Sequence, residues 1–269
     1  EQLCGGINYG AARGVGSVSF SAMALVMGLL TKKYGASVLP LSGLVSVFAQ
    51  GGVLYVITRR TGMRPTAAQP QRSGDQAASL AGFIRGNGRF CVLMLGIAML
   101  FFSCNLSNNF LINIARNVGG DEASLGGINA FMALTEVPVM FLYDRMARRI
   151  GCPATIRIAA AAFVAKALGI ALAGSVPALY AAHALQALSF AVITPAMVRY
   201  VNLYISSKDS AKGQSISYNM TTLGSIFASC LGGVMFDSMS VRAALLTGTA
   251  VAAVGAAVCL AFARPADRS

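Results

Sequence analysis

FCVLMLGIAMLFFSCNLSNNFLINIA, residues 90–115, contains not one charged side chain. A helix that crosses the hydrocarbon core of a bilayer needs about 20 predominantly apolar residues. Four more stretches, 14–31, 34–58, 213–236 and 243–263, are equally free of charge. A soluble protein of this size would not need five such runs, because its surface must be largely polar or charged. The pattern therefore predicts that residues 90–115 contain one membrane-spanning helix and that further spans precede and follow it in the sequence.

The composition of the whole chain leads to the same class. The 269 residues are 56% hydrophobic and 11% charged, whereas roughly 25% of the residues of a soluble domain are charged. This excludes a soluble enzyme, a disulfide-stapled secreted domain and a disordered chain. We predict an all-α, polytopic transmembrane protein with about eight spans. Their approximate limits are 13–30, 38–58, 90–112, 124–143, 155–173, 177–199, 213–235 and 243–263.

Two features divide these spans. The stretch 158–198 is about twice the length of one span, so we expect it to turn at Gly174-Ser175-Val176-Pro177, where turn-forming residues cluster. Residues 59–89 carry six arginines and two prolines and are predicted to be a solvated linker. The linker separates a two-span piece, residues 1–58, from a six-span piece, residues 90–269.

The net charge of +12 comes from basic residues between the apolar runs. With eight spans, 16 of the 21 Lys and Arg side chains fall on one side of the membrane. The exceptions are Lys32, Lys33, Arg116 and Arg242 on the other side and Lys166 within a span. Basic residues concentrate in cytoplasmic loops, so we predict a cell-membrane protein with both ends of this chain in the cytoplasm. The same distribution argues against nucleic-acid binding, which needs a basic face on a folded surface.

The six cysteines show no close spacing, and His183 is the only histidine. Cysteines within spans behave as small apolar residues, and metal sites and disulfide frameworks need recurring Cys or His spacings. We therefore expect no disulfide, no metal site and no cofactor.

Three stretches of the chain resemble the major facilitator superfamily. They are NYGAARGVGSVSF at 8–20, DRMARRIG at 144–151 and LGGVMFD at 231–237. They are similar to the start of helix five, the basic loop between helices eight and nine, and the outer end of helix eleven in the lactose-permease-like and nucleoside or oligosaccharide proton-symporter branch. The loop motif comprises Asp144, Arg145, Arg148, Arg149 and Gly151.

The resemblance implies that the eight spans correspond to helices five to twelve and that the first four helices of the fold are lacking. It also implies two helical bundles around a midplane cavity that opens to each side in turn. The expected function is secondary transport of a small polar solute such as a sugar or nucleoside, coupled to protons, by a monomer. The alternatives are a truncated remnant that does not transport and an intramembrane enzyme, although catalytic motifs are missing.

Arg13 and Phe20 share one helical face. In the resembled branch, an arginine and an aromatic residue at these places bind and stack on the sugar, which makes both candidates for substrate binding. Arg13 could instead anchor the helix at the membrane surface.

Glu136 and Lys166 are the only acid and the only base deep within predicted spans. A charged residue at the centre of a span costs about 2.5–3.5 kcal/mol on insertion scales, so it indicates function. The resemblance implies coupling roles for both residues, and a purely structural ion pair is the alternative. It also places Gln186, His183 and Ser189 where the resembled permease has a coupling histidine, a lysine and a proton-carrying carboxylate. The proton relay of that permease is therefore not reproduced.

Amides and hydroxyls gather near the end of the third predicted span. We expect amides there to bind a hydroxyl-rich solute, or else to join helices through hydrogen bonds. The cluster consists of Asn105, Ser107, Asn108, Asn109 and Asn113, and Gln186 is a further candidate for substrate binding. Pro138 and Pro195 can break the helical hydrogen-bond ladder near the cavity, as helices of transporters tolerate.

Overall fold

The structure is a computed structural model that describes residues 9–35, 37–61 and 79–264. Every regular element in these ranges is helical, which confirms the all-α prediction. Seven helical segments of the described residues are long and apolar enough to cross a membrane, as expected of a polytopic membrane protein. They are Val38–Arg60, Gly88–Asn109, Glu122–Ile150, Cys152–Leu172, Val176–Tyr204, Ser210–Ser238 and Val241–Phe262.

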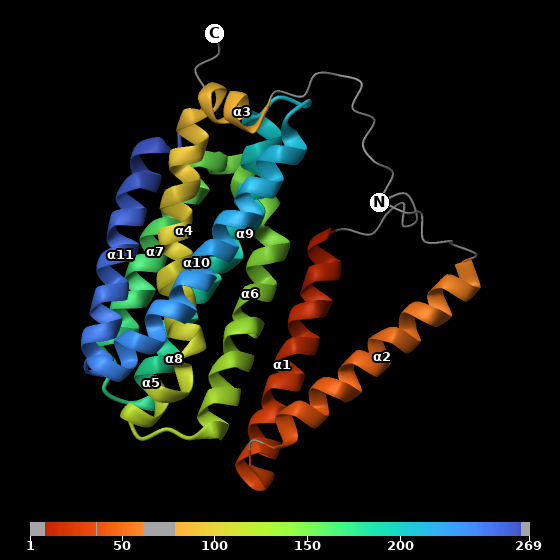
Figure 1. The fold of residues 1–269 in the computed structure, drawn as a ribbon, viewed down its shortest axis with the longest axis vertical. Helices are drawn as coiled ribbons and strands as arrows, with labels where there is room; N and C mark the ends of the chain where they lie inside the picture. The colour runs from red at the N-terminus through yellow and green to blue at the C-terminus, as the bar shows by residue number, and fades with distance from the viewer. Residues whose placement is uncertain (1–8, 36, 62–78, 265–269) are drawn as a thin grey trace.

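The first part of the chain forms two helices, α1 (Tyr9–Tyr34) and α2 (Val38–Thr61). The 26 residues of α1 exceed the length that one crossing requires. It is not among the seven apolar segments, however, so the eighth span at 13–30 stays a prediction. In Figure 1, α1 lies along α6 (Glu122–Ile150), while α2 diverges from the rest of the molecule.

The second part is a bundle built from six membrane-length segments. Their helices are α4 (Gly88–Asn109), α6 (Glu122–Ile150), α7 (Cys152–Leu172), α8 with α9 (Val176–Ala184 and Phe190–Tyr204), α10 (Ser210–Ser238) and α11 (Val241–Phe262). Helix α4 packs against both α10 and α11, and α7 packs against α11 and α9. Small residues at these contacts allow the close helix packing that stabilises bundles in lipid.

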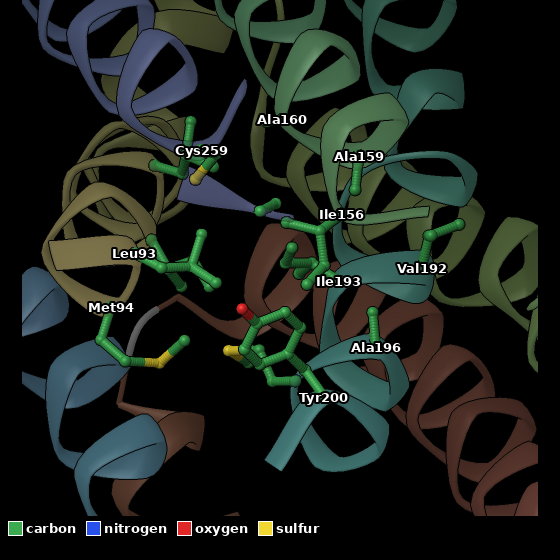
Figure 2. Packing of buried hydrophobic residues seen from close by; sticks show 14 of the residues in the cluster. Leu93, Met94, Ile156, Ala159, Ala160, Val192, Ile193, Ala196, Tyr200 and Cys259 are labelled. Atoms are coloured by element: carbon green, nitrogen blue, oxygen red, sulfur yellow. The ribbon is translucent and has the colours of Figure 1, made fainter. Parts of the chain in front are cut away.

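The main core lies where α4, α7, α9 and α11 meet, as Figure 2 shows. Leu93 of α4, Ile156 of α7 and Val192 of α9 are fully buried there. Alanines on α7 and α9 complete the contact, with Ala160 and Ala196 fully buried. This core fixes the helices that carry the polar residues described below.

Four predictions about boundaries need correction. The basic motif from Asp144 to Arg149 is not a loop, because α6 continues to Ile150. Arg, Met and Ala are good helix formers, and only Gly151, with φ of 83°, ends the helix. Likewise, the predicted linker 59–89 is partly helical. Arg59 and Arg60 belong to the end of α2, and α3 (Leu80–Gly86) begins after Ser79, whose hydroxyl accepts a hydrogen bond from the Gly82 amide.

The two remaining corrections concern the interruptions of the spans. Helices α6 and α9 run through Pro138 and Pro195. The break falls instead at the 3-10 turn η1 (Leu185–Ala187), between α8 and α9. The third predicted span, 90–112, also ends early, because Phe110 separates α4 from the short helix α5 (Leu111–Asn117). The predicted turn after α7 is correct, since α8 starts at Val176 with Ser175 as its cap.

Candidate functional site

A buried acid, amide and base lie in a row inside the six-span bundle. The Lys166 ammonium of α7 donates a hydrogen bond to Oε1 of Gln186 at 2.6 Å. The amide nitrogen of Gln186 in turn donates to Oε1 of Glu136 on α6 at 2.9 Å. The exposed fractions of Glu136, Lys166 and Gln186 are 9%, 2% and 4%. We call these three residues the buried triad.

The break between α8 and α9 brings Gln186 into the triad. Gln186 is the central residue of η1, and the turn is held by the Ser189 hydroxyl, which donates to the Leu185 carbonyl at 2.8 Å. Ser189 is itself fully buried. A 3-10 stretch within a longer helix often marks a functional position. Here it places the amide between two charges that come from other helices.

Lys166 has weaker contacts on its other side. Its ammonium lies 3.9 Å from the Cys104 sulfur and 4.0 Å from the Met132 sulfur. Sulfur is a weak acceptor, so these contacts satisfy an ammonium poorly. A void of about 10 Å³ borders Lys166 between α4 and α7, with the hydroxyl residues Ser103 and Ser107 in its wall. Such a void has room for about one water molecule.

His183 lies on α8, three residues before Gln186. It is fully buried, and neither ring nitrogen has a hydrogen-bond partner within the described ranges. A buried polar group without a partner costs free energy and calls for an explanation. Within the described ranges, the structure therefore places His183 in no hydrogen-bonded relay.

The amides near the end of α4 do not converge on the triad. Asn105 donates to the Phe101 carbonyl of its own helix at 2.8 Å, and Asn108 donates to the Cys104 sulfur at 3.6 Å. Asn109 is exposed and donates to the Ser229 hydroxyl of α10 at 2.9 Å. The bond from Asn109 joins two helices, whereas Asn113 lies exposed on α5.

A polar stripe on α10 was not predicted from the sequence. Tyr218, Thr222, Ser225 and Ser229 follow one another at intervals of four, three and four residues, so they share a helix face. The side chain of Tyr218 is 73% exposed, and Ser229 receives the bond from Asn109. The helical spacing of these four residues in an uncharged span was the available signal.

Phe20 faces a groove on the surface of α6. Phe20 is 57% exposed and lines a groove of about 300 Å³ between α1, α2 and α6. Met23, Met27 and Leu125 also line this groove, with Asn129 as a polar neighbour. Arg13 belongs to α1, but its side chain lies outside the described residues.

The residues of the basic motif lie at one end of α6. Asp144 pairs with Arg199 of α9 at 3.5 Å, which ties the end of α6 to α9. Arg145, Arg148 and Arg149 are exposed there, and Gly151 provides the turn into α7.

A second set of charges occupies the opposite end of α6. Lys32, near the end of α1, pairs with Asp121 at 2.6 Å, and Arg116 pairs with Glu122 at 2.5 Å. Asp121 also caps α6 by accepting from the Ser124 amide. The hydrogen bond from Lys32, together with those from Ser124, lowers the pKa of Asp121 well below its usual range. The pair joins the first part of the chain to the six-span bundle.

Comparison with known proteins identifies the family. Residues 5–246 match the MFS_1 like family. The chain is also similar to the maltose permease of Geobacillus stearothermophilus, with 23% identity over 260 residues. The matching stretch covers 96% of this chain and 64% of the permease, so the chain spans slightly less than two thirds of that relative's length. Since the family match covers most of the chain, the chain belongs to the MFS_1 like family of the major facilitator superfamily.

Proposed function

We propose that this chain serves a proton-coupled permease that carries a sugar or a similar hydroxyl-rich solute across the cell membrane. The family supports secondary transport. The similarity to a maltose permease supports a sugar as the solute. The buried triad supports coupling to protons and is the observation that carries the proposal.

The triad suits coupling because its carboxylate is buried but not isolated. Ionisable residues within membrane spans are costly and typically serve ion or substrate pathways. Glu136 can exist as a carboxylate that accepts from Gln186, or as an acid after it binds a proton. We therefore assign proton binding to Glu136 and charge compensation to Lys166.

Candidate solute contacts come from α1 and from the pair of helices α4 and α10. Phe20 offers an exposed aromatic face on α1, and Arg13 precedes it by two turns of the same helix. Asn105, Asn108 and Asn109 of α4 and the stripe on α10 offer amides and hydroxyls. We propose that these groups bind solute hydroxyls, with Gln186 acting within the triad rather than on the solute.

The residues at the helix ends support one orientation of the chain in the membrane. In Figure 1, α3 and the end of α11 lie at one end of the molecule, while α5 lies at the other. The exposed Arg145, Arg148 and Arg149 lie at the end of α6 that is remote from α5. We propose that the arginine-rich end faces the cytoplasm, in keeping with the positive-inside rule.

Uptake of labelled maltose into proteoliposomes tests the proposal. An inward proton gradient should drive accumulation by the unaltered protein, and Glu136→Gln should abolish gradient-driven accumulation while leaving the protein inserted. Glu122→Gln is the matched control, because it removes a carboxylate from the exposed end of the same helix. It should retain accumulation.

Two results would contradict the proposal. Normal accumulation by Glu136→Gln would remove the coupling role of Glu136. An absence of any uptake by the unaltered protein, with maltose or with other sugars and nucleosides, would favour the alternative of a chain that does not transport.

A further inference from the structure

The groove between α1, α2 and α6 is built like a pocket for a small ligand. Its volume is about 300 Å³, and most of its lining is apolar, including Phe20 and Met23 of α1 and Leu125 of α6. Pockets for small ligands typically measure about 300–1,000 Å³ and combine apolar and aromatic walls with a few polar groups that orient the ligand. Asn129 of α6 contributes a side-chain amide to this lining. We call this pocket the α1 groove.

The packing of α1 against α6 brings Asn129 near the level of Phe20. The two helices run antiparallel, because Lys32 pairs with Asp121 while a Cβ on Gly28 would lie 2.8 Å from the Gly126 Cα atom. Three residues beyond Gly126, Asn129 is therefore level with the part of α1 around residues 24–25. Phe20 lies one turn farther along α1, a rise of about 6 Å. A sugar ring with its hydroxyls can bridge this separation.

Asn129 has an amide that is available to a ligand. The side chain is half-buried, and the amide has no hydrogen-bond partner among the residues that the structure describes. Amides in membrane helices commonly bond across to a neighbouring helix, so an amide that faces a groove instead needs a polar ligand or water. The carboxylate of Glu122, at the other end of the groove, already pairs with Arg116.

We propose that Asn129 and Phe20 form a subsite for one sugar ring, in which Phe20 covers an apolar face of the ring and the Asn129 amide binds a hydroxyl at its edge. The inference rests on the proposed function, in which the solute is a sugar or a similar hydroxyl-rich molecule. It adds Asn129 to the candidate contacts as a residue that determines specificity.

The chemistry of the amide favours a hydroxyl over an acyl chain as the group bound there. An amide can donate and accept hydrogen bonds, and a hydroxyl can do both in return. A lipid acyl chain in the groove would cover the amide without offering it a partner, which costs free energy. One fixed amide selects for a hydroxyl at one position of the ring.

Fluorescence titration with maltose tests the proposal in the full chain in lipid vesicles. The chain contains no tryptophan, so Phe20→Trp introduces a single fluorescent reporter into the groove and keeps an aromatic face there. Maltose should change this fluorescence in a saturable manner. Equilibrium dialysis with labelled maltose should give the same dissociation constant for Phe20→Trp as for the unaltered protein, within about threefold.

Asn129→Leu, made in the Phe20→Trp protein, keeps the approximate size of the side chain and removes both hydrogen-bonding groups. It should raise the dissociation constant for maltose about tenfold. Asn117→Leu is the matched control, because Asn117 is an exposed amide at the end of α5, outside the groove. This control should leave the affinity unchanged.

Maltose analogues that each lack one hydroxyl distinguish a direct hydrogen bond from a change in folding. If Asn129 binds one hydroxyl, the analogue without that hydroxyl should bind equally to the Phe20→Trp protein and to its Asn129→Leu variant, because residues in contact are not additive. The other analogues should retain the tenfold difference. A difference that persists for every analogue would mean that Asn129 acts through the fold, and it overturns the proposal.

Three further outcomes are decisive. Equal maltose affinities with and without Asn129→Leu overturn the subsite, and so does fluorescence that is quenched by brominated acyl chains but unaffected by maltose, which assigns the groove to lipid. Gradient-driven accumulation of maltose that is unaltered in Asn129→Leu removes the subsite and retains the proposed function. Maltose binding that depends on Asn129, without gradient-driven accumulation, supports the subsite and removes the proposed proton coupling.

Discussion

Lys166 shows how one buried residue depends on its neighbours. Its ammonium is almost fully buried and has Gln186 as its strong hydrogen-bond partner. Lys166→Ala removes the cation of the triad, which is linked to Glu136 through the Gln186 amide. Loss of one partner of a buried charge pair costs about 3–5 kcal/mol, so Lys166→Ala should lower the thermal unfolding midpoint in detergent markedly.

The double variant separates charge from packing. Lys166→Ala combined with Glu136→Gln removes both charges and should unfold at a higher temperature than Lys166→Ala alone. Lys33→Ala, which changes an exposed lysine at the end of α1, should leave the midpoint unchanged. A double variant no more stable than Lys166→Ala would show that Glu136 and Lys166 are not energetically linked.

Residue types and hydropathy predicted Glu136 and Lys166 as special, because each is the sole charge of its sign deep in a predicted span. They did not predict that Gln186 lies between the two. Gln186 is 50 residues from Glu136 and 20 from Lys166. A single amide in an apolar stretch gives no local signal of its partner, since the contact arises only when α6, α7 and η1 pack together.

At the scale of elements, Gly151 ends α6 with a backbone that favours glycine. Its φ of 83° and ψ of 152° lie in a region that is essentially restricted to glycine, and other residues there cost about 1–3 kcal/mol. Gly151→Ala should therefore lower the unfolding midpoint and the yield of folded protein. Gly174→Ala is the control, because a Cβ at Gly174 would meet open space and its φ is not positive.

The outcome of this comparison tests where α6 ends. An equal effect of the two substitutions would mean that Gly151 does not hold the strained turn between α6 and α7. Measurement of both variants in the same detergent makes the difference between them independent of the absolute midpoint.

Helix positions followed from the sequence wherever runs without charge were long and ended in turn residues. Residues 174–177 show this, since α7 ends at Leu172 and α8 begins at Val176. The break at Leu185–Ala187 has no glycine or proline to announce it. Pro138 and Pro195 lie inside α6 and α9, because neighbouring helices can compensate for the backbone bond that each proline removes.

At the scale of the whole molecule, α1 and the six-span bundle meet closely near one end. A Cβ placed on Gly28 would lie 2.8 Å from the Gly126 Cα atom, so only glycine permits this approach of α1 to α6. One turn farther along α1, Lys32 forms its ion pair with Asp121. The close contact and the ion pair together hold the two parts of the chain at the end opposite the arginine-rich motif.

Removal of this ion pair should loosen that end without disturbing the caps. Asp121→Asn removes the charge, yet asparagine is as good a helix cap as aspartate. Spin labels at the exposed positions Tyr34 and Asn117 would report the distance between α1 and the bundle. We expect Asp121→Asn and Lys32→Gln to lengthen or broaden this distance distribution, and Lys33→Gln to leave it unchanged.

The same measurement gives a pH dependence with a definite sign. Lys32 lowers the pKa of Asp121. In the folded protein, Asp121 is therefore ionised at every pH above the usual pKa range of an aspartate. The stabilisation by the ion pair is therefore fully present from pH 5.5 to 7.5 and is lost only in stronger acid, as the pH falls through the lowered pKa. The spin-label distance should not change between pH 7.5 and 5.5. A distance that lengthens within this interval would show that Asp121 is not the carboxylate that Lys32 holds ionised.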